Sequence, residues 1–396
     1  MLAYRSAAVA YNDHMVILID KPTHVWSIEL PTPKVSRRNR LTNTAAETLP
    51  CRTRRLFSRT CLSALMISLA LPASVTAQQP VEFKWLAFAQ LSAERIDGVD
   101  NTLAFDAERI RARLQADAGR LSVVAQFDLG VNDPSGRRPG SIPNGILDLF
   151  ASYRFANKHT VRFGEFKTPL GMDFNLPVHA LDITQRAMEL GLALNRDFGV
   201  MLSGQNVLQG ISYDVGIFNP AGRSQATRFD NAQVGKDSTF VARVRYDHGD
   251  WHAELAYGLT ENAGGPATAD YSVTDLAVRY TPNSWSFKAE WIDGSDVLGL
   301  QNRSERVHYL HGSYRLSQSL ELVARRYAGR SQIGAASTDL SNTYLGLTKH
   351  FSNERKLRTR LQVNYVLAGQ DQTAYTGLRG FRDDALFIQL QVYAEK

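Results

Sequence analysis

Three arginines that alternate with apolar residues are the strongest candidates for chemistry in this chain. They are Arg109, Arg111 and Arg113. In a β-strand this spacing places all three guanidinium groups on one face and the apolar residues between them on the other. Stacked guanidinium groups repel one another unless anions or carboxylates lie nearby, and their planar forks suit phosphate and other oxyanions. The spacing predicts either an anion-binding row or an arginine wall braced by Asp and Glu on facing strands.

Further cations have the same two-residue spacing, or lie in a long connection between predicted strands. Lys288 alternates with apolar residues, and Arg186 either lines a constriction or faces solvent. The complete set of candidate anion-binding residues is Lys167, Arg109, Arg111, Arg113, Arg186, Arg243, Arg245, Lys288, Arg358 and Arg360.

Other kinds of site have little support in the sequence. There is no phosphate-cradling glycine loop, no nucleophile elbow and no zinc-ligand spacing. The histidines are scattered, and both cysteines, Cys51 and Cys61, precede residue 78. We therefore expect no enzyme activity, no cofactor, no metal and no nucleic-acid partner.

The rows of cations must be positioned by strands, and segments of about ten residues with period-two alternation recur to the C-terminus. We predict sixteen strands over 82–91, 103–115, 120–130, 147–155, 160–167, 197–204, 208–217, 239–247, 251–260, 271–281, 284–293, 305–316, 319–327, 340–351, 356–367 and 384–394. Short and long connections alternate, and the long ones are expected at 92–102, 131–146, 168–196, 218–238, 261–270, 294–304, 328–339 and 368–383. This pattern predicts an all-β fold, a 16-stranded antiparallel transmembrane β-barrel, because tilted strands of this length cross a bilayer.

A soluble β-sandwich is the alternative, since it gives the same local alternation. It does not require long connections at one end only, nor aromatic residues repeatedly at strand ends. Such aromatic residues are typical of the interfacial girdles of membrane barrels. They are Trp251, Tyr257, Tyr280, Trp285 and Trp291.

The N-terminal segment has the features of an export signal. Residues 51–77 combine a basic start, an apolar stretch and small residues before a cleavage site near Ala77. Residues 1–50 fit no signal peptide and are interpreted as a mis-annotated extension, with a genuine N-terminal extension as the alternative. Residues 1–77 hold 10 of the 45 Lys and Arg and 4 of the 39 Asp and Glu, so residues 78–396, the predicted barrel domain, hold 35 of each. The basic balance of the whole chain therefore indicates nothing about its partners.

The connection over 168–196 is long enough to have a function of its own. Asp182 and Gln185 have the spacing of a helix N-cap and its capping-box partner, and Gly191 suits a helix end. The sequence predicts a helix here. An inward fold would narrow the channel, whereas an outward fold would cap the barrel mouth.

Motifs around this connection resemble the phosphate-selective porin O and P family. They are the segment 164–171 with the sequence GEFKTPLG, the Met188-Glu189 pair, the segment 196–200 with the sequence RDFGV, and the two strands around Arg109–Arg113 and Leu149–Tyr153. The resemblance implies a homotrimer of sixteen-stranded barrels, each with an inward third loop. It also implies that Lys167 matches the lysine of the family's F-K-T-P motif, and that Arg109, Arg111 and Arg113 match its lumen arginines.

These observations predict an outer-membrane porin of a Gram-negative bacterium, a water-filled channel that prefers anions, with phosphate or polyphosphate selectivity as the finer expectation. A general, weakly selective porin is one alternative, and an enzymatic or adhesive barrel is another. The expected partners are inorganic anions such as phosphate, outer-membrane lipid and lipopolysaccharide, and two further copies of the chain.

Overall fold

The computed structural model describes residues 8–11, 14–17, 80–97, 100–129, 145–156, 158–186, 188–219, 238–261, 269–354, 356–369, 378 and 380–396. The chain divides into two units, Met1–Ser74 and Val75–Lys396. In the first, β1 (Ala8–Tyr11) and β2 (His14–Ile17) pair as a small antiparallel hairpin. Apart from this hairpin, the predicted extension and signal peptide lie outside the described residues.

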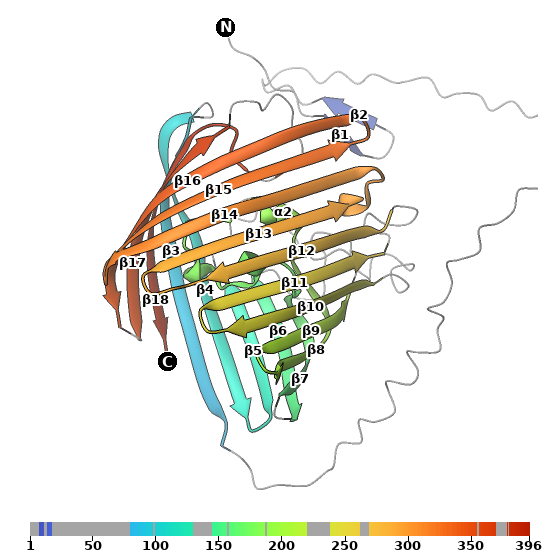
Figure 1. The fold of residues 1–396 in the computed structure, drawn as a ribbon, viewed down its shortest axis with the longest axis vertical. Helices are drawn as coiled ribbons and strands as arrows, with labels where there is room; N and C mark the ends of the chain where they lie inside the picture. The colour runs from blue at the N-terminus through green and yellow to red at the C-terminus, as the bar shows by residue number, and fades with distance from the viewer. Residues whose placement is uncertain are drawn as a thin grey trace, which may run out of the picture. The chain divides into compact units, whose positions relative to one another are not determined.

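The second unit is a closed barrel of sixteen antiparallel strands (Figure 1). Its strands are β3 (Glu82–Ile96), β4 (Asp100–Ala118), β5 (Leu121–Asp128), β6 (Ile146–Ala156), β7 (His159–Lys167), β8 (Arg196–Leu208), β9 (Ile211–Phe218), β10 (Thr239–His248), β11 (Trp251–Thr260), β12 (Tyr271–Tyr280), β13 (Trp285–Ser295), β14 (Arg303–Ser317), β15 (Leu320–Ile333), β16 (Ala336–Asn353), β17 (Leu357–Ala368) and β18 (Ala385–Glu395). All sixteen predicted strands are confirmed, and the sandwich alternative is excluded.

The barrel closes where its last strand pairs with its first. β18 runs antiparallel to β3, from the pair Ala385 and Ile96 to the pair Glu395 and Leu86. Because every edge is paired, the backbone polar groups of the strands are satisfied without water, which a structure needs in order to cross a membrane.

The two faces of the wall differ as the alternation predicts. Large apolar side chains are exposed on the outside, for example Val244, Leu276 and Leu310. Polar side chains such as Gln362 and Asn364 are buried on the inside. Aromatic rings collect at strand ends as expected for a girdle: Trp251 stacks on Tyr280, with ring centroids 4.2 Å apart, and Trp285 lies 4.4 Å from Tyr314.

Two connections expected to be long are short. Over 92–102, β3 continues to Ile96 and β4 begins at Asp100, with register shifts that mark β-bulges in this ladder. Over 328–339 the chain makes a two-residue hairpin turn at Gly334, whose φ is +59°. The ladder is continuous to this turn, and it includes a cross-strand ion pair between Arg330 and Asp339 at 2.7 Å.

The helix predicted from Asp182 to Gly191 is wrong in its position. The β7–β8 connection contains α1 (Met172–Asn175), the 3-10 turn η1 (Val178–Ala180) and α2 (Glu189–Leu192). Residues 182–185 are bends and residue 186 has no regular structure, so Asp182 caps no helix, and Gly191 lies inside α2. Asp182 instead pairs with barrel side chains. The spacing of Asp182 and Gln185 cannot show whether the aspartate caps a helix or forms an ion pair.

No described helix is sufficiently long and apolar to cross a bilayer.

Candidate pore and anion site

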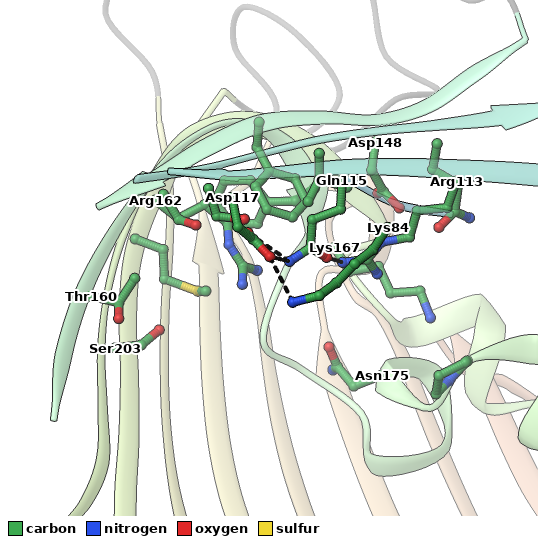
Figure 2. Close-up of a pocket in the computed structure, with 18 of the residues that line it drawn as sticks. Lys84, Arg113, Gln115, Asp117, Asp148, Thr160, Arg162, Lys167, Asn175 and Ser203 are labelled. Carbon is green, nitrogen blue, oxygen red and sulfur yellow. Dashed lines mark hydrogen bonds and ion pairs between the residues drawn. The ribbon is translucent and has the colours of Figure 1, made fainter. Parts of the chain in front are cut away.

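A cavity of about 970 Å³ opens between strands β3–β10 and the first part of the β7–β8 connection (Figure 2). Positive groups outnumber negative ones around it. The Lys and Arg residues are Lys84, Arg111, Arg113, Arg120, Arg154, Arg162, Lys167, Arg196, Arg243 and Arg245, and the Asp and Glu residues are Glu82, Asp117, Asp148 and Asp214. This excess of cations gives the cavity a positive field that low-dielectric walls strengthen.

Ion pairs neutralise part of that charge. The pairs are Arg111–Asp128 at 2.9 Å, Arg196–Asp148 at 2.8 Å, Arg243–Asp214 at 2.8 Å and Arg245–Asp214 at 3.4 Å. The bracing alternative considered for these arginines therefore describes some of them. Asp214 contacts both Arg243 and Arg245, and Glu254 lies 3.6 Å from Arg243, so two carboxylates balance two arginines at this point of the wall.

Four cavity arginines have no ion pair in the part of the chain that is described: Arg120 and Arg154, which are exposed near the short turns, and Arg113 and Arg162, which are half-buried. Arg113 donates to the side-chain oxygen of Gln115 at 3.2 Å. Arg162 places its guanidinium 4.4 Å from the ring centre of Phe150 and 5.0 Å from that of Phe166. Stacking on aromatic rings orients a guanidinium without neutralising it. These are the two arginines best able to meet an anion.

Lys167, the last residue of β7, holds the start of the connection. Its ammonium donates to the carbonyls of Phe174 and Leu176, the latter at 3.0 Å. Arg186 donates to the same Leu176 carbonyl, and to that of Asp173 at 2.9 Å. Burial lowers the pKa of Arg186 to about 10, so it stays charged at neutral pH. Lys167 lines the cavity, whereas Arg186 organises the turn behind it.

Backbone amides of the connection bind carboxylates on strands β12 and β13. The Gly171 amide donates to Asp275 at 3.0 Å, and the Met172 amide donates to Glu290 at 2.7 Å. Gly171 has a φ of +86°, which glycine adopts without strain. Strand carboxylates thereby fix the position of α1.

Side chains of the connection form buried ion pairs with the same region of the wall. Asp173 lies 2.6 Å from Arg325 of β15 and 3.6 Å from Lys288 of β13. Burial raises the pKa of Asp173, but Arg325 and Lys288 outweigh burial and hold that pKa well below its usual range. Asp182 pairs with Lys288, and the ring of His311 lies 3.3 Å from its carboxylate. Asp173 is therefore ionised and fully compensated inside the protein.

Polar contacts extend this attachment to β17 and β18. The Thr184 amide donates to Asn364 at 2.7 Å, and Gln362 donates to the Asp182 carbonyl at 3.1 Å. Gln391 donates to the carbonyl of His179 at 3.1 Å. The connection thus touches β12, β13, β15, β17 and β18 through hydrogen bonds or ion pairs.

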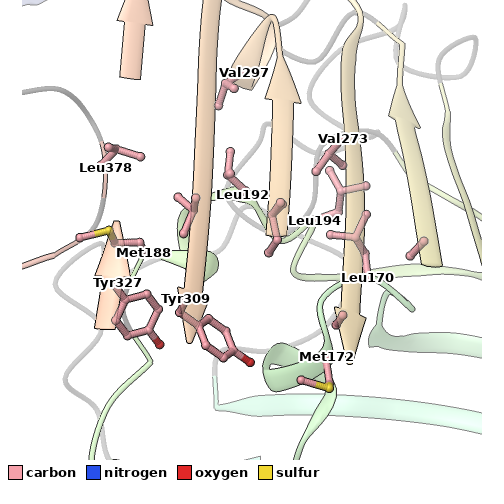
Figure 3. Close-up of a cluster of buried hydrophobic side chains, with 14 of the residues drawn as sticks. Leu170, Met172, Met188, Leu192, Leu194, Val273, Val297, Tyr309, Tyr327 and Leu378 are labelled. Atoms are coloured by element: carbon pink, nitrogen blue, oxygen red, sulfur yellow. The ribbon is translucent and has the colours of Figure 1, made fainter. Parts of the chain in front are cut away.

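A buried apolar cluster supports the same attachment (Figure 3). It joins side chains of the connection to strand residues. Those labelled in the figure are Leu170, Met172, Met188, Leu192, Leu194, Val273, Val297, Tyr309, Tyr327 and Leu378. At about 25 cal/mol per Å² of apolar surface removed from water, such packing stabilises one docked position of the connection.

His179, in η1, lies at the other margin of the cavity. Its ring packs 5.4 Å from Phe88 and 4.5 Å from Tyr393, measured between ring centroids. Burial, followed by Arg360 and Arg358, lowers the pKa of His179 to about 4, so the ring is neutral at pH 7.

The structure separates the ten candidate residues into two groups. Arg111, Arg113, Lys167, Arg243 and Arg245 line the cavity. The other five have protein partners elsewhere: Arg109 pairs with Glu108, Arg186 with backbone carbonyls, Lys288 with Asp173 and Asp182, Arg358 with Glu395, and Arg360 with Gln391. The anion-binding role of all ten remains a prediction.

Several cavity cations were missed by the sequence analysis, above all Arg162 and Arg196. Arg162 lies in a predicted strand but stands alone there, without the paired arginines that drew attention elsewhere. Arg196 opens a motif used only for the resemblance. Arg162 could have been found by assigning every arginine of each predicted strand to the inner or outer face from the alternation. Nothing in the sequence shows that Arg196 faces the cavity.

Groups of three or more metal-ligating side chains are absent from the described residues.

Comparison with known proteins supports the architecture. Residues 85–247 match the model of the family described as phosphate-selective porin O and P, which confirms the predicted resemblance over that range. No curated protein sequence matches the chain significantly.

Solved outer-membrane proteins share the fold at low sequence identity. OmpT of Vibrio cholerae, in a trimer form, has a TM-score of 0.58 at 13% identity, over 80% of this chain and 100% of that one. An anion-selective porin from Comamonas acidovorans has a TM-score of 0.54 at 13% identity, over 80% and 99%. Salmonella typhi OmpF, in complex with daunomycin, has a TM-score of 0.59 at 11% identity, over 80% and 98%. At these identities the likeness shows the fold alone.

Proposed function

We propose that this chain forms a water-filled diffusion channel in the bacterial outer membrane, and that the channel prefers anions. The observation that carries this proposal is the cavity with ten cations and four carboxylates on its lining. The match to the porin O and P family and the porin-like fold support the channel itself.

Selectivity would arise from capture that is weak enough to be reversible. An anion in the cavity meets the unpaired guanidinium groups of Arg113 and Arg162, while Asp148 and Asp214 compete for the neighbouring arginines. Conduction requires binding that draws an ion in and still releases it. Phosphate suits this lining because it can accept hydrogen bonds from several guanidinium groups at once.

We further propose that the β7–β8 connection is the constriction. Its attachment to β12–β18 leaves the opposite wall, β3–β10, as the open side, and the cavity lies there. Lys167 and His179 would form the loop margin of the pore and Arg113 and Arg162 its wall margin.

A general, weakly selective porin is the second candidate, and the cavity carboxylates favour it. Asp148 and Asp214 each neutralise an arginine, and Asp117 is paired with Lys84 at 3.0 Å. An enzymatic or adhesive barrel has no comparable observation in its support.

The setting of the channel follows from the same proposal. Residues 51–77 would direct export and be removed near Ala77, with residues 1–50 preceding the true start of the chain. The trimeric form of the OmpT structure supports a homotrimer here, in contact with outer-membrane lipid and lipopolysaccharide.

Planar bilayers test the proposal with one charge reversal and a matched control. Arg113→Glu should shift the zero-current potential in a KCl gradient toward cation preference, because it adds a carboxylate beside the pore. Lys349→Glu makes the same charge change on the outer wall, near the strand ends joined by short turns, and should leave the potential unchanged. Phosphate titrated into chloride should reduce the current of the wild type.

Each contrary result has a clear meaning. An unchanged potential in Arg113→Glu together with a chloride current that phosphate does not block would favour the general porin. Absence of any conductance from the purified barrel would refute the channel.

A further inference from the structure

Arginines interrupt the apolar outer wall on β14 and β15. On the outside of β15, Leu322 and Ala324 are followed by Arg326 and Arg330, and on β14 Arg306 and His308 precede Leu310. We call Arg306, Arg326 and Arg330 the outer arginine patch. Cations on a lipid-facing wall are destabilising near the bilayer midplane, so this patch needs an explanation.

Two of its members are neutralised within the wall. Arg306 pairs with Asp293 of β13 at 3.2 Å, and Arg330 pairs with Asp339 of β16 at 2.7 Å. Both pairs lie close to the end of the barrel that carries the long connections. Cross-strand ion pairs of this kind brace the ladder without further ligands.

Arg326 has only hydroxyl partners. Its guanidinium donates to Thr343 at 2.6 Å and to Ser341 at 3.0 Å. Thr343 lies opposite Arg326, whereas Ser341 lies opposite Ala328, nearer the long-connection end. The side chain therefore extends toward that end of the barrel, as long cationic side chains do when they reach for a membrane interface.

Arg326 lies deep in the apolar band of the wall, so its side chain must extend to reach polar surroundings. It lies six residues after Leu320, where β15 begins, or about 20 Å along the strand at the usual rise. With a strand tilt of about 40°, that is about 15 Å above the turn, inside an apolar band about 25 Å tall. Its neighbour Leu310 is 67% exposed, so none of the described residues covers the wall beside Arg326.

Charge decides between the possible occupants. The remaining guanidinium N–H groups of Arg326 find no acceptor within the described chain, and an anion would satisfy them. A contact between two copies of the patch would bring no free carboxylate to Arg326, because Asp293 and Asp339 are already paired. A phosphate on a lipid can approach from the membrane and remain in it.

We propose that the outer arginine patch, centred on Arg326, binds a phosphate of lipid A in the outer leaflet. This inference rests on the proposed outer-membrane setting, with the long connections outside. The phosphate would sit between Arg326 and the level of Arg330, and acyl chains would cover Leu310 and the apolar wall below.

Native mass spectrometry of the full barrel in detergent, with diphosphoryl lipid A as the probe, tests the proposal. Charge-assisted hydrogen bonds contribute about 1.5–3 kcal/mol, so Arg326→Gln should weaken binding by about 10-fold to 100-fold. Arg326→Lys should retain most of the affinity. Lys349→Gln removes an outward cation near the opposite, short-turn end and should bind as the wild type does.

Three results would overturn the proposal. They are a wild type that binds no lipid A, equal binding of lipid A from which both phosphates have been removed, and an Arg326→Gln variant that binds lipid A as tightly as the wild type. A change of oligomer size in that variant would instead assign the face to a subunit contact. Conductance of Arg326→Gln should equal that of the wild type, which separates this test from a failure of the channel proposal.

Discussion

Arg325→Met is the sharpest perturbation of the docked connection between β7 and β8. The Arg325 guanidinium lies 2.6 Å from Asp173 and donates to Tyr327 at 2.8 Å and to His311 at 3.2 Å. The side chains of Arg325 and Asp173 are both fully buried. Methionine has a similar length but cannot compensate the carboxylate, which keeps only the more distant ammonium of Lys288, at 3.6 Å, as a cationic partner.

Breaking a buried ion pair by removing one partner costs about 3–5 kcal/mol. At 1.4 kcal/mol for each factor of ten, the ratio of docked to undocked connection falls by roughly two to three and a half orders of magnitude. The sixteen-stranded ladder does not depend on this pair, so we expect the barrel to form. Single-channel recording should show a larger conductance and more open-channel noise than in the wild type.

A second variant separates docking from general damage. Replacing both members of a buried pair by apolar residues is often close to neutral, so Arg325→Met combined with Asp173→Leu should recover much of the wild-type conductance. Equal conductance and noise in Arg325→Met and the wild type would refute the reasoning, because the ion pair would then contribute nothing to docking.

Two further predictions concern pH and backbone geometry. The folded pKa of His179, about 4, lies below its ordinary value of 6.5. The unfolded chain therefore binds a proton first, and stability should fall as pH decreases from about 6.5 to 4; His179→Phe should flatten this slope in urea unfolding followed by heat-modified gel mobility. Gly164→Ala should cost about 1–3 kcal/mol, because φ is +132° and its Cβ would lie 2.3 Å from the Leu149 carbonyl oxygen. Gly334→Ala, with a φ of +59° and no atom within 4 Å of its Cβ, should cost less in the same assay, and equal losses would contradict the steric argument.

The strands could be predicted because the alternation of apolar and polar residues within each strand reflects the two faces of the wall, one apolar and one polar. In β10, Phe240, Val244 and Tyr246 face outward, while Arg243 and Arg245 face inward, as the alternation indicates. Strand ends were harder to place, because the last pairs of a ladder depend on partners across the sheet. The hairpin of β15 and β16 continues through residues that resemble a loop in sequence, where Arg330 faces Asp339 across the ladder.

The site could be predicted only in part, because pairing between distant segments is invisible in a single sequence. Lys288 has the spacing of a lumen cation, and it does face inward, but two carboxylates of the β7–β8 connection occupy its ammonium. Conversely, Arg162 has no repeat around it and becomes important only because aromatic rings, rather than carboxylates, surround its guanidinium.

The balance of charge between the two halves of the barrel links these observations. Residues 78–396 carry as many acidic as basic residues, so a positive cavity requires that some carboxylates be used elsewhere. On the other side of the barrel, Asp173 and Asp182 of the β7–β8 connection bind an equal number of cations, Lys288 and Arg325, and leave this balance unchanged. Asp275 and Glu290 bind backbone amides there, away from the cavity lining. The hydrogen bonds that hold the connection against β12–β18 thus keep carboxylates away from the opposite wall, where the cations remain in excess. On this reasoning docking and anion preference are coupled, and a substitution that releases the connection should lower selectivity even when it changes no residue of the cavity.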